Sequence, residues 1–194
     1  MKMRNRSSMW IALLSAVTLV LLASSIAFAQ KLPKSIYIQA QAMGEQQQMG
    51  RTFNITLIIE EFSPTTDQQG LLEAFQQKGN EGLTRALDKM HSKGRMSITG
   101  TLGYEVSYIR QWKEPDGSTK YRLVTNRPIT FGEAWSDSRS MDYSISGVEL
   151  IIFPDKKKNT GTLFPLVKLK MNKENHLELE TFQNPWKLVD VRER

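Results

Sequence analysis

Cysteine is absent from the 194-residue sequence, and histidine occurs twice. Without cysteine the chain has no disulfides, no thiol nucleophile and no thiolate ligands for zinc, iron–sulfur or C-x-x-C redox sites. His91 and His176 each lack a second histidine nearby in the sequence, and each is expected to be a surface or capping side chain. The sequence therefore predicts no metal site and no cofactor.

Several catalytic motifs are missing as well. The sequence contains no G-x-S-x-G nucleophile turn, no G-x-x-x-x-G-K-[ST] or G-x-G-x-x-G phosphate loop, and no D-x-D-x-D-G calcium loop. We therefore assign no catalytic residue. Acid pairs for a hydrolase remain available, although a chain of this size always supplies some. The acids concerned are Glu60, Glu61, Asp137, Asp142, Glu178 and Glu180.

The overall composition is that of a folded domain. Hydrophobic residues make up 40% of the chain and charged residues 24%, with 12 glycines and 7 prolines. These values exclude a disordered tail, a collagen-like repeat and a disulfide-stapled mini-protein. Because domains usually span roughly 100–200 residues, one domain is expected.

Residues 1–29 have the three parts of a secretory signal peptide. Three basic residues precede an almost wholly apolar run at 10–23, and Ala27-Phe28-Ala29 places small residues where a signal peptidase needs them. The alternative is a retained membrane anchor, but a spanning helix needs about 20 apolar residues, and this run is shorter. We expect cleavage after Ala29 and a periplasmic or secreted mature chain, which meets the membrane only through the leader before cleavage.

Much of the net positive charge belongs to this leader. The whole chain carries 26 basic and 20 acidic residues, a net charge of +6. Removal of Lys2, Arg4 and Arg6 leaves 23 basic against 20 acidic residues, a net charge of +3. The dense run Lys156–Lys158 lies among turn-forming residues, which predicts a solvated hairpin tip rather than an anion site. No nucleic-acid partner is predicted.

Residues 30–51 are expected to be a flexible lead-in to a single strand-rich domain at 52–194. The Gln-rich stretch 39–50 shows no apolar periodicity, although Ile36–Ile38 has the composition of a short strand. From Phe53 to Glu60, apolar residues alternate with polar or mixed ones. This period of two predicts the first strand of the domain, with one buried face.

The period changes from two to that of a helix after Ser63-Pro64. Over residues 66–92, apolar side chains recur three and four positions apart, which is typical of a helix with one buried face. Thr66 with Gln69 fits a capping box, Gly79 fits a helix end, and Asn80 fits the cap of a second helix. The pattern predicts two short amphipathic helices, or one broken at Gly79, that cover a sheet.

From Arg95 onward the sequence is strand-like. Apolar residues hold even positions from Met96 to Trp112, with a bend or bulge expected at Gly100 and Gly103. Glu114–Gly117 predicts a hairpin turn before the strand that contains Tyr121 and Leu123. Pro165 is expected at an edge or a strand start. Further strands are predicted at 130–135, 143–153, 163–171, 176–182 and 186–191.

Tight turns between successive strands imply antiparallel pairing, because parallel neighbours need long crossovers. The expected fold class is therefore α+β: an antiparallel meander of about seven strands with a short helical insertion after the first strand. The alternative is a closed or curled β-barrel, since about eight strands suffice to close one.

One stretch combines charge, aromatic groups and a restricted backbone. Arg127, Glu133, Trp135 and Arg139 surround a turn that contains Pro128, and we predict these four as ligand-binding residues. The alternative interpretation is a core tryptophan beside a satisfied ion pair.

This stretch, residues 125–135, together with Gly147–Phe153 resembles the pattern of uncharacterised exported bacterial proteins with a strand-rich domain. The resemblance covers roughly residues 52–191. It implies export and a strand-rich domain, and it brings no activity and no site.

These observations favour an exported cell-envelope module that binds a ligand or a partner and has no catalytic activity. The partner would be an envelope protein at a strand edge, or a small apolar ligand held by a curled sheet. The alternative is a carboxylate-based hydrolase acting on an envelope or extracellular polymer, which needs two carboxyl groups about 5–10 Å apart in one cleft. The sequence leaves enzyme activity open and favours a non-enzymatic role.

Overall fold

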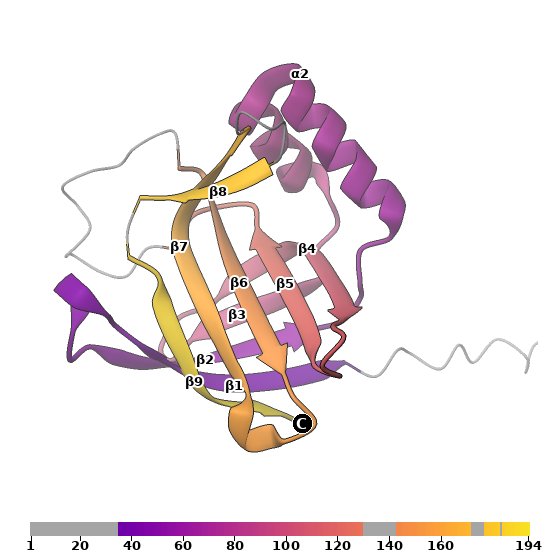
Figure 1. Cartoon of the computed structure of the whole chain (residues 1–194). Helices are drawn as coiled ribbons and strands as arrows, with labels where there is room; N and C mark the ends of the chain where they lie inside the picture. The colour runs from indigo at the N-terminus through magenta and orange to yellow at the C-terminus, as the bar shows by residue number, and fades with distance from the viewer. Residues whose placement is uncertain (1–34, 130–142, 172–176, 183) are drawn as a thin grey trace, which may run out of the picture. The chain divides into compact units, whose positions relative to one another are not determined.

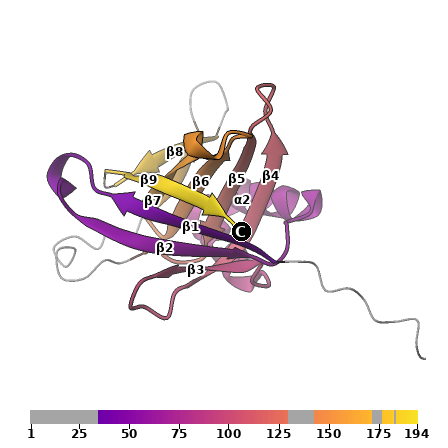
Figure 2. The same cartoon turned by 90° about the horizontal axis from the view of Figure 1, so that it is seen from below.

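Eight antiparallel strands close into a barrel. A broken helix packs against the outside of the barrel wall (Figure 1 and Figure 2). The computed structural model describes residues 35–129, 143–171, 177–182 and 184–194. The leader at 1–29 and the strand expected at 130–135 lie outside the described residues.

The strands follow the chain in the order β1 (Ile36–Met43), β2 (Thr52–Ile59), β3 (Gly94–Ile98), β4 (Tyr104–Lys113), β5 (Thr119–Thr125), β6 (Ile145–Ile152), β7 (Thr160–Met171), β8 (Leu177–Thr181) and β9 (Trp186–Glu193). The helix α2 (Thr65–Lys89) joins β2 to β3, and the short 3-10 turns η1 (Gln46–Gln48) and η3 (Lys156–Lys158) lie in hairpins. In space the order is β6-β5-β4-β3-β2-β1-β9-β7-β8. Pairing of β6 with β7 closes the ring and leaves β8 outside it.

The main expectation of a meander is therefore wrong, and the alternative of a closed barrel is confirmed. A meander pairs each strand with its neighbour in the chain and leaves two free edges. Here the pairing follows chain order from β1 to β6, but β9 then inserts between β1 and β7. The α+β character is confirmed, because α2 is the helical insertion that the sequence predicted.

Strand β1 occupies part of the segment that was expected to be a lead-in, residues 30–51. Ile38, Ala40 and Ala42 are buried in the barrel, whereas Gln39 is exposed. The alternation is weak in the sequence because alanine is only slightly apolar and glutamine dominates the composition. Residues 34–194 form one structural unit, so the folded unit begins well before residue 52.

The inside of the barrel is filled with apolar side chains from all eight strands of the ring. Leu57, Leu123 and Leu150 are among those with essentially no exposed surface. Burial of this surface supplies most of the favourable free energy of folding, at roughly 25 cal/mol per Å². Packed side chains therefore occupy the space inside the barrel that a curled sheet would offer a ligand.

Helix α2 is broken at Gly79, as the sequence predicted. Gly79 has φ 60° and ψ −144°, a conformation that glycine adopts without the strain a Cβ would bring. The predicted capping box is wrong, because the helix begins at Thr65 with Pro64 at the N-cap and no side-chain cap. Asn80 bonds the backbone of Leu169 in β7 with its side-chain amide.

A second apolar cluster holds α2 against the outer wall of the barrel. Phe75, Leu83 and Leu87 of the helix meet Tyr108, Ile145 and Val167 of strands β4, β6 and β7. The protein thus has one core inside the barrel and another between barrel and helix. The helical period predicted this buried face, although the sheet that it covers is the outside of a barrel.

The strand-like run from Arg95 is two strands rather than one bent strand. Gly100 and Gly103, both with φ 86°, form the turn between β3 and β4, and Leu102 at its tip is 93% exposed. A register shift between Val106 and Tyr108 then moves Tyr108 from the inner to the outer face. Apolar residues occupy even positions on both sides of the turn and of the bulge, so their spacing in the sequence revealed neither feature.

Other predicted turns agree with the structure. At Glu114–Gly117 the chain makes the hairpin turn between β4 and β5, and the exposed lysines of η3 form the tip between β6 and β7. Pro165 is at neither an edge nor a strand start. It lies at a register irregularity within β7, between the residues that pair with β9 and those that pair with β8, which is a position that proline tolerates.

Candidate functional site

The structure describes one of the four residues predicted to bind a ligand. Arg127 lies with its guanidinium carbon 4.8 Å from the ring centroid of Tyr104 and donates a hydrogen bond from Nη2 to the Gly103 carbonyl at 3.2 Å. Its side chain lines none of the four cavities described below. Glu133, Trp135 and Arg139 lie outside the described residues, so the proposed cluster stays a prediction.

A groove runs between α2 and the outer wall of the barrel, and we call it the α2 groove. Its apolar section has a volume of about 500 Å³, within the range of roughly 300–1,000 Å³ typical of small-molecule sites. The residues that line it are Gln68, Leu71, Leu72, Phe75 and Leu83 from the helix, and Tyr108, Arg122, Glu149, Phe164 and Leu169 from the wall.

A polar cavity adjoins this apolar section at Gln68 and Tyr108, and we call it the polar section of the α2 groove. Gln68 and Tyr108 line both sections, and the second section, of about 370 Å³, is bounded further by residues 62–65 and by Arg110 and Gln111. The apolar section therefore borders a section that Arg110 lines.

Two arginines and a tryptophan form a cationic row beside the groove. Arg110 and Arg122 are direct cross-strand partners on β4 and β5, and their guanidinium carbons lie 5.7 and 5.4 Å from the Trp112 ring centroid. Arg122 donates from Nε to Glu149 Oε1 at 2.7 Å. In the described part of the chain Arg110 has no carboxylate partner, so its charge is available to a ligand.

Tyr108 lies between the apolar and the polar sections of the α2 groove. Burial raises the pKa of its hydroxyl, while the neighbouring Arg110 and Arg122 guanidinium groups act in the opposite direction. A tyrosine hydroxyl is protonated at neutral pH with or without this rise, so that of Tyr108 is available as a hydrogen-bond donor.

The residues of the groove were missed by sequence reasoning, although a signal existed. The predicted turn at Glu114–Gly117 sets the pairing of the flanking strands, and this pairing places Arg110 opposite Arg122. Residues 110 and 112 of one strand and 122 of the other then share a face, since side chains alternate along a strand. What the pattern did not indicate is that α2 would cover the neighbouring part of this face.

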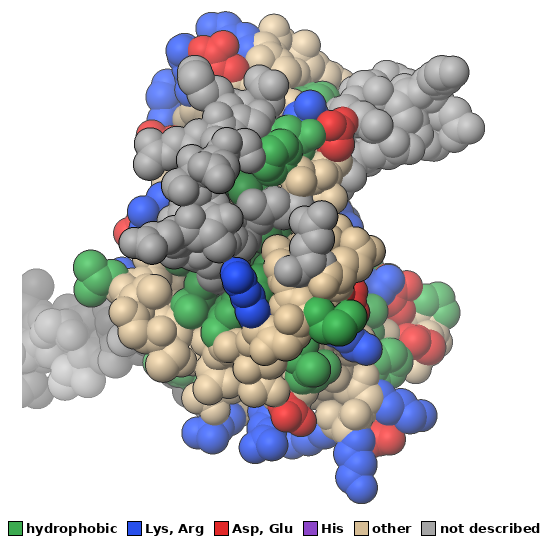
Figure 3. Space-filling view, turned by 90° about the vertical axis from the view of Figure 1, so that its left-hand side faces the viewer, with side chains coloured by type: hydrophobic (Ala, Val, Ile, Leu, Met, Phe, Trp, Pro, Cys, Tyr) green, Lys and Arg blue, Asp and Glu red, His purple; other side chains and the backbone are tan. Residues whose placement is uncertain are grey.

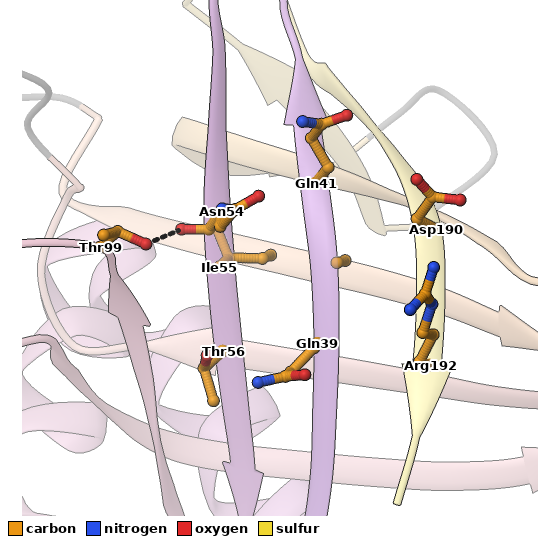
Figure 4. A pocket seen from close by; sticks show the side chains of 9 residues that line it. Gln39, Gln41, Asn54, Ile55, Thr56, Thr99, Asp190 and Arg192 are labelled. Atoms are coloured by element: carbon orange, nitrogen blue, oxygen red, sulfur yellow. Dashed lines mark hydrogen bonds between the residues drawn. The ribbon is translucent and has the colours of Figure 1, made fainter.

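A second hollow lies on the opposite wall of the barrel, since β1 is four strands from β5 in either direction around the ring. We call it the polar site; it has a volume of about 390 Å³. Figure 4 shows its side chains, which project from β1, β2 and β9 and from the end of β3. The residues that line it are Gln39, Ala40, Gln41, Asn54, Ile55, Thr56, Thr99, Asp190 and Arg192.

Carboxylates do not gather in these cavities. The α2 groove contains Glu149 and the polar site contains Asp190, while the cavity next to the polar site is lined by Ser35, Tyr37, Gln39, Thr56 and Arg194 and contains none. Among the described residues, no group of three or more His, Asp or Glu side chains is arranged to hold a metal ion.

Two of the six acids considered for a hydrolase take part in structural contacts. Glu61 accepts a hydrogen bond from Lys93 at 3.0 Å, and Glu180 accepts one from the Tyr143 hydroxyl at 2.6 Å. Asp137 and Asp142 lie outside the described residues. The four cavities therefore give the two-carboxylate hydrolase no support.

The face drawn in Figure 3 carries interspersed hydrophobic, polar and charged side chains. Basic side chains gather at its lower end, the end at which Figure 1 places the turn between β6 and β7. Within the described ranges, no helix is both long enough and apolar enough to cross a membrane.

Comparison of the chain with known protein families, with curated proteins and with solved structures found no match. The resemblance to exported bacterial proteins over residues 52–191 therefore stays a prediction.

Proposed function

We propose that the chain is an exported, non-enzymatic binding module of the cell envelope that holds a small amphipathic molecule in the α2 groove. The observation that carries this proposal is that the apolar section shares Gln68 and Tyr108 with a section lined by Arg110, a guanidinium that has no carboxylate partner among the described residues. An apolar body and an anionic end are the complement of such a groove.

The apolar body of the ligand would lie between helix and wall. Leu71 and Phe75 approach from α2, and Phe164 approaches from β7. Leu72 lies at the rim with 38% of its surface exposed. Each Å² of apolar surface that a ligand removes from water here is worth roughly 25 cal/mol, so a chain of several carbons is held without any hydrogen bond.

The anionic end of the ligand would lie against Arg110 and Tyr108. A guanidinium binds a carboxylate or phosphate through two parallel hydrogen bonds, which are stronger than bonds between neutral groups. The Tyr108 hydroxyl adds a third donor. Because Arg122 is already paired with Glu149, Arg110 is the residue whose charge a ligand would neutralise.

Export and a binding role support each other. The leader pattern at 1–29 sends the chain outside the cytoplasm, and the apolar groove suits a molecule that water solubilises poorly. A binding module also needs no catalytic group, in agreement with the missing motifs.

Calorimetric titration with sodium dodecanoate tests the proposal on protein produced from the full chain. We expect one saturable site, and we expect dodecyltrimethylammonium, with the same tail and a cationic end, to bind at least about tenfold more weakly, a difference of about 1.4 kcal/mol. Leu72→Asp is expected to weaken dodecanoate binding, because it adds a negative charge at the groove rim. Leu102→Asp is the matched control, because Leu102 is exposed on the β3–β4 turn away from the groove.

Two outcomes would overturn the proposal. One is the lack of saturable binding of dodecanoate by the folded protein. The other is an equal affinity in the Leu72→Asp and Leu102→Asp variants, which would mean that the probe binds outside the groove.

A further inference from the structure

We propose that the polar site on β1, β2 and β9 binds a neutral glycan segment. This site goes beyond the α2 groove, since it lies on the opposite wall and shares no residue with it.

Hydrogen-bonding capacity in the polar site is unused. In the described part of the chain, the side-chain amides of Gln39, Gln41 and Asn54 make no hydrogen bond to another residue. Thr99 donates to the backbone carbonyl of Asn54 at 3.5 Å, the dashed line of Figure 4. Primary amides donate and accept at the same time, as do the hydroxyl groups of a sugar. Amides that project from neighbouring strands of one sheet are therefore matched to a polyhydroxylated ligand.

The register places these amides side by side. Gln39 is the direct partner of Thr56, and Gln41 is the direct partner of Asn54. Figure 4 shows Gln39 leaning across from β1 toward Thr56, and Arg192 lying along β9 next to Asp190. Side chains from three neighbouring strands thus face one hollow.

Charge in the polar site is balanced, because Asp190 and Arg192 contribute one charge of each sign. Within the described residues neither forms a salt bridge, so both are available for charge-assisted hydrogen bonds to a ligand. A site without net charge favours a neutral ligand over an anion or a cation. This feature distinguishes the polar site from the cationic end of the α2 groove.

A bulge in β9 positions these two charged residues. Leu188 and Val191 both point into the barrel although they are three positions apart, and the register with β1 shifts between Gln39 and Gln41. Asp190 is the added residue, with φ 50°. A bulge of this kind redirects a side chain, and a positive φ at a residue other than glycine costs free energy. Here the bulge directs the Asp190 side chain to the outer face, where it lines the polar site.

An aromatic ring extends the site along β1. Tyr37 is 47% exposed and lines the adjoining cavity, which shares Gln39 and Thr56 with the polar site. The negative face of such a ring attracts the C–H groups of a sugar. From Tyr37 to Gln41 the strand advances about 13 Å at roughly 3.3 Å per residue, which is long enough for contacts with more than one sugar ring.

An array of immobilised neutral and anionic oligosaccharides, with chitotetraose, cellotetraose and maltotetraose among the neutral ones, tests the proposal with protein from the full chain. We expect retention of at least one neutral oligosaccharide, followed by a calorimetric titration with that sugar. The double variant Gln39→Ala/Gln41→Ala is expected to bind it at least about tenfold more weakly. The control Gln76→Ala/Gln77→Ala removes two exposed glutamines from α2 and should leave the affinity unchanged.

A second variant separates binding from folding. Asp190→Gly removes the carboxylate at a position where glycine relieves strain, so we expect an unchanged or raised Tm together with weakened glycan binding. A structural role alone would instead leave the affinity unchanged.

The proposal is overturned if no neutral oligosaccharide is retained, if anionic ones are retained preferentially, or if the Gln39→Ala/Gln41→Ala and Gln76→Ala/Gln77→Ala variants bind equally. Because Leu72→Asp alters the α2 groove alone, failure of glycan binding and failure of dodecanoate binding are distinguishable.

Discussion

Asn80 and Leu169 are joined by two hydrogen bonds across 89 positions of the chain. Asn80 Nδ2 donates to the Leu169 carbonyl at 2.8 Å, and the Leu169 N–H donates to Asn80 Oδ1 at 2.8 Å. The Asn80 amide thereby makes the two backbone hydrogen bonds to Leu169 of β7 that a neighbouring strand would otherwise make. This pair holds α2 against the barrel immediately after the break at Gly79. It therefore fixes the position of the helix that forms one side of the α2 groove.

Replacement of Asn80 by alanine is expected to lower the free energy of unfolding by about 1–3 kcal/mol, because two partly buried backbone groups of Leu169 lose their partner. Urea unfolding measures the change. Gln77→Ala, at an exposed position of the same helix, is the control and should cost little. Equal losses in the two variants would show that the pair is not important for stability.

Two glycines of α2 are expected to respond to alanine with opposite signs. Gly79→Ala should destabilise the protein by about 1–3 kcal/mol, since its backbone lies in a region that residues with a Cβ avoid. Gly70→Ala should stabilise it by about 0.5–1 kcal/mol, because Gly70 is helical and a Cβ there meets open space. Thermal unfolding checks both, and changes of the same sign would contradict the assignment of the break to Gly79.

Lys93 is buried between two carboxylates, with Nζ 3.0 Å from Glu61 and 3.6 Å from Asp67. Lys93→Met should lower stability by about 2–4 kcal/mol, because Asp67 keeps its charge and loses its counter-ion. Glu61→Gln should cost less than about 1 kcal/mol, since the Glu61 side chain is half exposed.

A double-mutant cycle measures this coupling. Lys93→Met combined with Asp67→Asn leaves no uncompensated charge at the pair, so we expect part of the lost stability to return. A double variant whose loss equals the sum of the two single losses would argue against the ion pair.

Tyr121 is expected to make stability fall at high pH. Burial raises the pKa of its hydroxyl to about 12, and Glu193 adds to this effect. The folded state therefore keeps the proton more tightly than the unfolded state, whose tyrosine titrates near 10. Stability from this difference is fully present below pH 10 and is lost as pH rises toward 12.

The loss should amount to about 1–2 kcal/mol, since each pKa unit corresponds to about 1.4 kcal/mol and solvent screening reduces the full value. Chemical denaturation at pH 9, 10, 11 and 12 measures it. Tyr121→Phe should flatten this part of the profile, and a variant with an unchanged slope would assign the loss to other groups.

The sequence was informative where one residue pattern corresponded to one local structure. The alternation at 53–60, the helical spacing over 66–92 and the turn at Glu114–Gly117 depend on neighbours in the chain, and each is found in the structure. The break at Gly79 was predictable for the same reason, because it depends on the missing Cβ of one residue.

Closure of the barrel was not predictable in this way. It depends on β9 pairing with β1 and β7, contacts between residues as far apart as Ile38 and Glu193. The bulges at Ser107 and Asp190 each shift the alternation by one residue, which a fixed period of two does not register. The α2 groove and the polar site depend on this closure, and the four residues chosen from the sequence were a local cluster of which the structure describes Arg127.

Strand β9 completes the ring, because it inserts between β1 and β7. Until residues 186–193 arrive, the earlier strands present two open edges that are able to pair with other chains. Such distant contacts form slowly and expose unpaired strands meanwhile. A chaperone that shields the edges of β1 and β7 until β9 has been synthesised would therefore protect this protein at its most vulnerable stage.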